Sequence, residues 1–207
     1  WVSRGAHKLI GALDAFRLDV AGRRCLDAGA STGGFTQVLL GRDVREVVAV
    51  DVGYGQLAWP VRTDPRVIVM ERTNVRDLTA DAIGGSVDLV VADLSFISLA
   101  TVLPALTACA SPGADIVPMV KPQFEVGKDR VGAGGVVSDP LLRADAVSTV
   151  ARRAAELNWH AVAVTASPLP GPAGNVEYFL HLRAQTDPLP PDVLDAAVHR
   201  AVEEGPQ

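Results

Sequence analysis

The stretch Asp27-Ala28-Gly29-Ala30-Ser31-Thr32-Gly33-Gly34-Phe35 decides the fold of this 207-residue chain. It follows an apolar run that begins at Cys25, and it leads into a helical pattern from Phe35 to Leu40. A glycine turn between a strand and a helix lets the backbone approach a ligand closely, because no Cβ atom stands in the way. The stretch therefore predicts a ligand-binding corner where a strand passes into a helix.

The spacing of the glycines selects among ligands. A dinucleotide fingerprint, Gly-x-Gly-x-x-Gly, needs its middle glycine so that the backbone can approach a pyrophosphate. Here the three positions are Gly29, Ser31 and Gly34, and Asp27 precedes the turn. A carboxylate there repels a pyrophosphate and suits a ligand with an ammonium group. We therefore expect S-adenosylmethionine (SAM), which carries an ammonium and a sulfonium, and keep an NAD-dependent dehydrogenase as the alternative.

Composition narrows the class of protein further. The chain is 48% hydrophobic and 21% charged, as in globular domains. Its two cysteines, Cys25 and Cys109, form no disulfide framework, which favours a cytoplasmic location. The net charge of -5 argues against binding nucleic acid by charge alone. The longest apolar region, 87–110, is interrupted by charges and a proline, so we expect no membrane span, and the histidines and cysteines lack metal-ligand spacing.

Continuous apolar runs alternate with helical patterns along the chain, as in a parallel sheet covered on both faces. We expect a first helix capped by Ser3 and another beginning after Ser138 or Asp139. The predicted strands are 24–27, 46–52, 67–71, 87–93, 115–120, 161–166 and 176–183, and the predicted helices are 3–16, 34–40, 56–61, 99–109, 140–157 and 188–202. This order predicts a doubly wound, Rossmann-like α/β domain of the class I SAM-dependent methyltransferase type. Its seven-stranded sheet is mostly parallel, with an antiparallel last strand.

In such a sheet a ligand lies outside the carboxyl ends of the strands. Asp51 ends the second predicted strand about 20 residues after the glycine turn, the usual place for an acid that binds ribose hydroxyls. Asn74 and Val75 follow the third strand and can hold an adenine edge. These positions indicate a nucleoside without choosing between SAM and NAD.

Four charged residues are predicted to meet at the same edge. Asp93 closes the fourth strand, Lys121 closes the fifth, and Glu177 begins the last one. If that last strand is antiparallel, its start lies beside the ends of the others, and Lys8 on the first helix completes the cluster. A sheet edge has no structural need for two cations and two anions, so we interpret the four as catalytic.

The order of these residues resembles the FtsJ-like RNA 2′-O-methyltransferases. More closely, four motifs are similar to the TlyA (haemolysin A) family: Ser3-Arg4-Gly5-Ala6-His7-Lys8-Leu9, Asp27 to Phe35, Ala92-Asp93-Leu94-Ser95-Phe96-Ile97-Ser98, and Val120-Lys121-Pro122-Gln123-Phe124-Glu125. The resemblance implies methylation of cytidine ribose in 16S and 23S ribosomal RNA within ribosomal subunits. The family's older name adds a membrane-active haemolysin as an alternative, although no segment is amphipathic enough to support it.

The resemblance also implies domains and site residues. Residues 1–2 would end an interdomain linker, 3–207 would form the methyltransferase domain, and an N-terminal S4-like RNA-binding domain would be absent from this chain. We expect a monomer without metal. The implied cofactor-binding residues are Asp27, Gly29, Ala30, Ser31, Thr32, Gly33, Gly34, Phe35, Asp51, Asn74, Val75, Asp93 and Phe96, and the expected RNA contacts are Arg4, His7, Lys128 and Arg130.

The chemistry assigns a role to each charged residue. A ribose 2′-OH is a poor nucleophile, so catalysis needs alignment and removal of its proton. Lys121 is the expected base, because the nearby cation Lys8 disfavours a second positive charge. Asp93 and Glu177 would orient the two lysines, and Lys8 would also position the hydroxyl.

Overall fold

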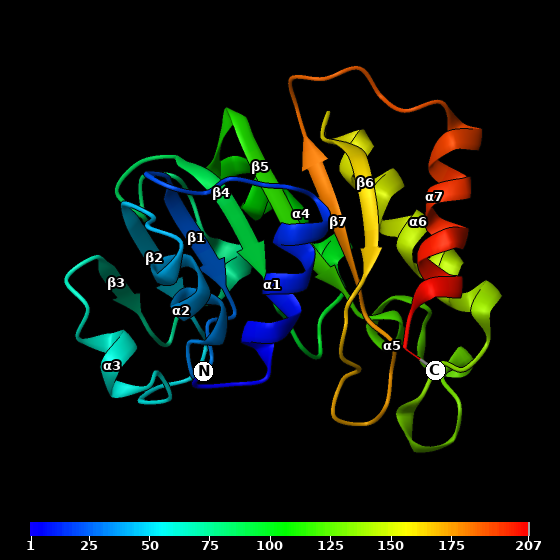
Figure 1. The fold of residues 1–207 in the computed structure, drawn as a ribbon, viewed down its shortest axis with the longest axis horizontal. Coiled ribbons are helices and arrows are strands. Elements are labelled where there is room, and N and C mark those ends of the chain that lie inside the picture. The colour runs from blue at the N-terminus through cyan, green and yellow to red at the C-terminus, as the bar shows by residue number, and fades with distance from the viewer. Residues whose placement is uncertain (207) are drawn as a thin grey trace.

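Seven strands form one sheet in the order β3-β2-β1-β4-β5-β7-β6 in the computed structural model, which describes residues 1–206 (Figure 1). Neighbouring strands from β3 to β5 are parallel, whereas β7 is antiparallel to both β5 and β6. The predicted fold class, including the antiparallel last strand, is confirmed. The strands are β1 (Arg24–Ala28), β2 (Glu46–Val50), β3 (Val67–Met70), β4 (Val87–Ala92), β5 (Ala110–Val120), β6 (His160–Ala166) and β7 (Tyr178–Arg183).

Helices cover both faces of the sheet. Helices α1 and α2 pack together on one face, and α4, α6 and α7 pack on the other (Figure 1). The helices are α1 (Gly5–Ala15), α2 (Gly34–Gly41), α3 (Trp59–Arg62), α4 (Leu99–Cys109), α5 (Pro122–Glu125), α6 (Pro140–Glu156) and α7 (Pro191–Glu204), with 3₁₀ turns at Val75–Asp77, Lys128–Arg130 and Ala133–Gly135.

Each strand contributes side chains to two separate cores, because successive residues of a strand point to opposite faces. In β4, Leu89 and Val91 pack on the α1 and α2 side, whereas Val90 and Ala92 pack on the α4 and α6 side. All four are fully buried. Burial on both faces explains why the strands read as continuous apolar runs rather than alternating ones.

Three details of the predicted elements are wrong. The N-cap of α1 is Arg4 without a side-chain cap, and Ser3 supplies only a backbone carbonyl to the N–H of Ala6. Strand β5 begins at Ala110, directly after α4, and so starts five residues earlier than the predicted strand 115–120. Helix α3 is a single turn that begins at Trp59 instead of near residue 56. Of the two suggested caps for α6, Asp139 is the one that accepts a hydrogen bond, from the N–H of Leu141.

Strand register places the charged residues at one edge. Ala28 of β1 pairs with Ala92 of β4, so Asp93 follows at the carboxyl end. Val120 of β5 pairs with Tyr178 of antiparallel β7, which sets Lys121 beside Glu177. The first residue before β7 therefore lies next to the first residue after β5.

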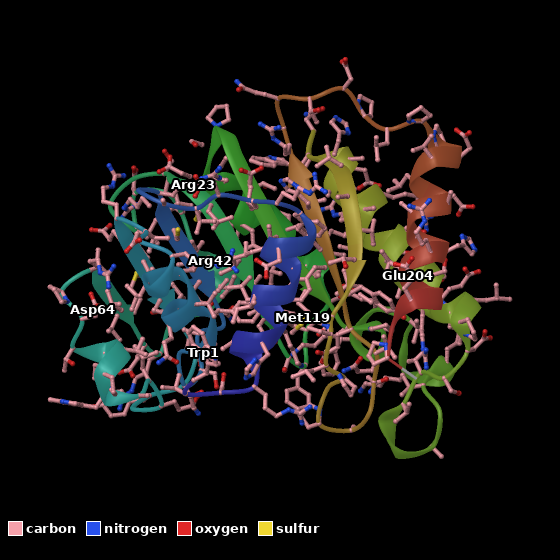
Figure 2. The ribbon with its side chains drawn as sticks, viewed as in Figure 1. Trp1, Arg23, Arg42, Asp64, Met119 and Glu204 are labelled. Carbon is pink, nitrogen blue, oxygen red and sulfur yellow. The ribbon has the colours of Figure 1, made fainter. Side chains whose placement is uncertain are left out.

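A second charged cluster lies at the opposite end of the sheet, where Figure 2 labels Arg23 far from Trp1. Buried Asp115 of β5 accepts hydrogen bonds from Arg23 (Nη1 to Oδ2, 2.5 Å) and His181 (Nε2 to Oδ1, 2.6 Å). Burial raises the pKa of Asp115, but hydrogen bonds from His181 and Arg23 outweigh it, so the pKa lies below its ordinary value. The cluster ties the start of β1 to β5 and β7.

Because the pKa of Asp115 is lower in the folded chain, its stabilisation is present above the unfolded pKa near ~4 and is lost as the pH falls. We expect Asp115→Asn to lower the free energy of unfolding by about 1.5–3 kcal/mol at pH 7, and the difference from wild type to shrink below about pH 4. Urea denaturation at several pH values measures it. The exposed Asp187→Asn is the control, and equal stability of Asp115→Asn and wild type at pH 7 would contradict the account.

Candidate active site

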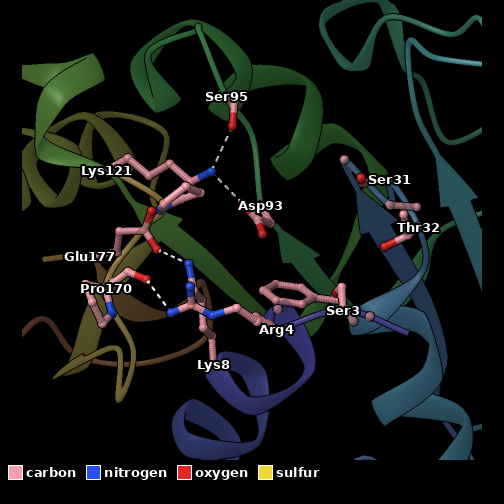
Figure 3. A pocket seen from close by; sticks show the side chains of 16 residues that line it. Ser3, Arg4, Lys8, Ser31, Thr32, Asp93, Ser95, Lys121, Pro170 and Glu177 are labelled. Atoms are coloured by element: carbon pink, nitrogen blue, oxygen red, sulfur yellow. Dashed lines mark hydrogen bonds and ion pairs between the residues drawn. The ribbon is translucent and has the colours of Figure 1, made fainter. Parts of the chain in front are cut away.

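A groove runs along the carboxyl ends of the parallel strands. One half, a cavity of about 380 Å³, lies between the start of α1, the glycine turn and the ends of β4 and β5 (Figure 3). The other half continues past Asp51 and Asn74. Four residues line both halves, which makes them one groove: Gly29, Ser31, Asp93 and Ser95.

The four predicted charged residues meet in the first half of this groove as two ion pairs (Figure 3). Lys8 Nζ lies 2.5 Å from Glu177 Oε2, and Lys121 Nζ lies 2.6 Å from Asp93 Oδ1. They come from α1, from the loop before β7 and from the ends of β5 and β4. The structure thus brings together residues that are up to 169 positions apart in the sequence.

The burial of the two lysines distinguishes them from surface lysines. The sequence contains three lysines, and two of them, Lys8 and Lys121, are only 7% and 8% exposed. Lysine is almost never fully buried unless it is paired. Glu177 is 1% exposed, whereas the Asp93 side chain keeps 27% of its surface accessible. The two lysines are therefore held in the wall of the groove. The accessible carboxylate of Asp93 lies where the two halves of the groove meet.

Gly29 is required by the close approach of two strand ends. Its φ is +88°, and a Cβ atom there would lie 2.3 Å from the carbonyl oxygen of Asp93. The N–H groups of Gly29 and Ala30 both donate to the carbonyl of Val50. The glycine therefore lets the turn pack against the end of β4, and the two N–H groups bind the turn to β2.

Most residues of the expected cofactor set line the groove, but Asp27 and Gly33 do not. Asp27 is fully buried beneath the turn, where Thr36 Oγ1 donates to its Oδ2 at 2.7 Å. Burial raises the pKa of Asp27 to about 7, and its Oδ1 has no hydrogen-bond partner among residues 1–206. The carboxylate of Asp27 therefore cannot contact the ammonium group of a ligand in the groove directly, contrary to the expectation from the sequence. Gly33 (φ +100°) faces away and packs against Leu57 and Val61.

The second half of the groove holds the predicted nucleoside residues. Asp51 follows β2, and its two oxygens accept the N–H groups of Ser31 (2.8 Å) and Gly53 (2.7 Å). Asn74 Oδ1 accepts the N–H of Arg76 and so caps the short 3₁₀ turn that contains buried Val75. The acid and the amide thus form the far end of the groove, opposite the two lysines.

Phe96 forms an exposed rim of the groove. It is 92% exposed, adopts φ +63°, and its ring centroid lies 5.3 Å from that of Phe124. Phe96 is therefore not part of the hydrophobic core. A neighbouring hollow beyond the two rings is lined in part by Lys128.

The expected RNA-contacting residues have different surroundings. Arg4 lines the groove and donates to the carbonyl of Pro170 at 3.4 Å, and His7 is exposed on α1. Lys128 is exposed, whereas Arg130 is engaged by Asp145 (3.5 Å) and by the carbonyl of Val126 (2.8 Å). Arg4, His7 and Lys128 are thus exposed, whereas Arg130 is held by neighbouring groups.

Ser95 is the groove residue that sequence reasoning missed. Its Oγ accepts a hydrogen bond from Lys121 Nζ at 2.9 Å (Figure 3). Its position two residues after Asp93, in a segment that leaves the strand, was the available signal. Ser3, Pro170 and Pro172 also line the groove without having been predicted.

No group of three or more histidine, cysteine, aspartate or glutamate side chains among residues 1–206 is arranged to hold a metal ion. Within the same residues, none of the helices has the length and apolar character needed to cross a membrane.

The fold and the groove place the chain in a class. A SAM-dependent methyltransferase structure from Listeria monocytogenes, 13% identical, superposes with a TM-score of 0.64 over 88% of this chain and 99% of the other. At this identity the likeness concerns the fold alone. The sheet order and the antiparallel β7 are thus those of the SAM-dependent methyltransferase class.

Sequence comparisons identify the family within that class. The model of the FtsJ-like methyltransferase family matches residues 1–184. The 16S/23S rRNA (cytidine-2′-O)-methyltransferase TlyA of Mycobacterium tuberculosis H37Rv is 74% identical over all 207 residues, which span 77% of that protein. A Streptococcus thermophilus structure that carries the name hemolysin is 38% identical, with a TM-score of 0.92 over 99% of this chain and 75% of the other. The chain belongs to the TlyA family of FtsJ-like methyltransferases.

The close approach at Gly29 can be tested by substitution. Both Gly29 and Gly22 have a positive φ (+88° and +72°) that is unfavourable for alanine. In Gly29→Ala the new Cβ would also collide with the backbone of Asp93, whereas in Gly22→Ala it would point into open space. We expect Gly22→Ala to cost about 1–2 kcal/mol of unfolding free energy and Gly29→Ala a further ~1–3 kcal/mol. Urea denaturation measures both. Equal losses would show that the contact with Asp93 is unimportant.

Proposed function

We propose that this chain is a SAM-dependent 2′-O-methyltransferase that acts on cytidine ribose in 16S and 23S ribosomal RNA. The observation that carries the proposal is the pair of ion pairs, Lys8–Glu177 and Lys121–Asp93, at one end of a groove that leads to Asp51. The 74% identity with a relative named for both 16S and 23S rRNA supports the choice of substrate.

The groove fits the proposed cofactor. Gly29 and Ser31 line the groove at the turn, Asp51 stands where a carboxylate can accept ribose hydroxyls, and Asn74 and Val75 lie beside it for an adenine edge. Once bound, SAM supplies a methyl group on a positively charged sulfur. The buried Asp27 contributes from beneath the turn, where ionisation of its carboxyl places a negative charge near a cationic ligand.

Lys121 is the proposed base. A ribose hydroxyl placed at the lysine end of the groove can pass its proton to Lys121 Nζ. Its oxygen would then take the methyl group that bound SAM supplies, and the sulfur would keep the electron pair of the broken carbon–sulfur bond as a neutral thioether. A lysine accepts a proton only as the neutral amine, so Lys121 must first lose one ammonium proton to solvent, which reaches the accessible Asp93 carboxylate of its ion pair. Lys8, held by Glu177, can then donate a hydrogen bond to the acceptor oxygen and fix its position.

RNA binding is proposed for the rim. Arg4 lines the lysine end of the groove, His7 is exposed on α1, and Lys128 lines the neighbouring hollow. These side chains can contact phosphates, and Arg130 can join them if it exchanges Asp145 for RNA. The net charge of -5 leaves this domain with little general attraction for RNA. We therefore propose that an N-terminal S4-like domain, joined through a linker ending at Trp1-Val2, adds affinity, and that the protein acts as a cytoplasmic monomer.

Transfer of tritiated methyl groups from SAM to purified 30S and 50S subunits tests the function. We expect the full-length protein to label cytidine 2′-O positions in both subunits. Lys121→Met should lower the rate about 10²- to 10⁴-fold, the usual contribution of a general base. Arg200→Ala, exposed on α7, is the control and should retain full activity.

Calorimetric titration separates the cofactor question from catalysis. SAM should bind wild type and Lys121→Met alike, whereas NADH should not bind. Binding of NADH in place of SAM would revive the dehydrogenase alternative. A folded Lys121→Met variant with full methyl transfer would remove Lys121 from the role of base.

A further inference from the structure

Ser95 contacts the proposed base without belonging to either ion pair. We propose that Ser95 is a positioning residue that, together with Asp93, fixes the direction of the Lys121 amine toward the acceptor hydroxyl. This inference rests on the proposed function, because it assigns Ser95 a role in the same methyl transfer.

The hydrogen bonds of Lys121 carry the inference. A lysine ammonium has three N–H donors on a flexible four-carbon stem, so a single ion pair leaves it free to rotate. Here one donor reaches Asp93 Oδ1 at 2.6 Å and a second reaches Ser95 Oγ at 2.9 Å. These two acceptors restrict the orientation of the amine and leave its third N–H for a ligand in the groove.

The segment that carries Ser95 is held in place independently of Lys121. Glu125, four residues after Lys121, accepts hydrogen bonds from Ser98 Oγ (2.6 Å) and from the N–H of Leu99 (2.8 Å). Phe96, with φ +63°, turns the chain between Ser95 and Ser98. Two connections therefore join the segments after β4 and β5: one is Glu125 with Ser98, which fixes the backbone, and the other is Ser95 with Lys121, which fixes the amine.

The surroundings of Ser95 separate a positioning role from a structural one. Ser95 is exposed and lines both halves of the groove, so loss of its hydroxyl removes no core packing. Ser86 is also exposed and lies directly before β4, at the end of that strand away from Lys121. It is therefore a suitable matched serine. The Ser95→Ala and Ser86→Ala variants therefore differ mainly in the contact with the lysine.

Methyl transfer provides the first test, with full-length protein and purified subunits. We expect Ser95→Ala to lower kcat about tenfold, because one hydrogen bond to a charged group is lost. The KM for subunits and the Kd for SAM should each change less than about twofold. The activity profile should shift to lower pH, because an acceptor that favours the ammonium form is gone. Ser95→Thr, which retains the hydroxyl, should recover most of the rate, and Ser86→Ala should match wild type.

Chemical labelling of lysines provides a second test that does not depend on activity. The three lysines give separate peptides, so mass spectrometry can follow the rate at which acetic anhydride modifies each. We expect Ser95→Ala to accelerate labelling of Lys121 relative to exposed Lys128 by about threefold or more, the effect of losing roughly 0.65 kcal/mol or more of hydrogen bonding. Ser95→Thr should restore the wild-type ratio.

The outcomes distinguish the inference from the function on which it rests. If wild type methylates neither subunit, the proposed function fails, whatever the labelling shows. If wild type is active but Ser95→Ala matches it in kcat, in pH profile and in Lys121 labelling, the positioning role of Ser95 is wrong. A fall in activity that Ser95→Thr does not recover, with unchanged labelling of Lys121, also contradicts it.

Discussion

The antiparallel placement of β7 is the constraint on which the site depends. In a wholly parallel sheet, every strand would begin at the end away from the groove. Because β7 runs against β5, it begins where β5 ends, and Glu177 comes to lie beside Lys121. The same strand carries His181 to Asp115 at the opposite end of the sheet. The residue directly before β7 therefore supplies an acid to the groove, β7 itself supplies a hydrogen-bond partner to Asp115, and the register of the strand sets both.

Pairing of buried charges links the stability of the groove to its chemistry. An unpaired charge in a protein interior is costly, whereas a charge with an opposite partner and hydrogen bonds is tolerated. Lys8 and Glu177, which are 7% and 1% exposed, satisfy each other. Asp93 is more accessible than Glu177, so the Lys121 pair is the one that solvent or a ligand can enter. This asymmetry fits the proposed roles, in which Lys8 positions the acceptor oxygen and Lys121 is the base.

The sequence predicted the strands, most helices and the meeting of four charged residues. Continuous apolar runs mark strands that are buried on two faces. Once the order and direction of the strands are known, the residues that meet at the carboxyl ends can be predicted. It did not predict that Asp27 would be buried or that Gly33 would face Leu57, because the direction of a side chain in a turn depends on what packs against it. Ser95 escaped for a related reason: the turn at Phe96, with φ +63°, aims it at Lys121, and no local pattern signals that conformation.

Asp93 connects the two halves of the groove through different parts of one residue. Its backbone carbonyl approaches Gly29 so closely that no side chain fits there, and its carboxylate binds Lys121. Ser31, with φ +49°, continues the same wall and is held by Asp51. Backbone conformations of this kind persist where the surroundings fix them. The glycine turn and the lysine end are therefore one unit: a displacement of the turn moves Asp93, and a displacement of Asp93 moves the amine that it holds.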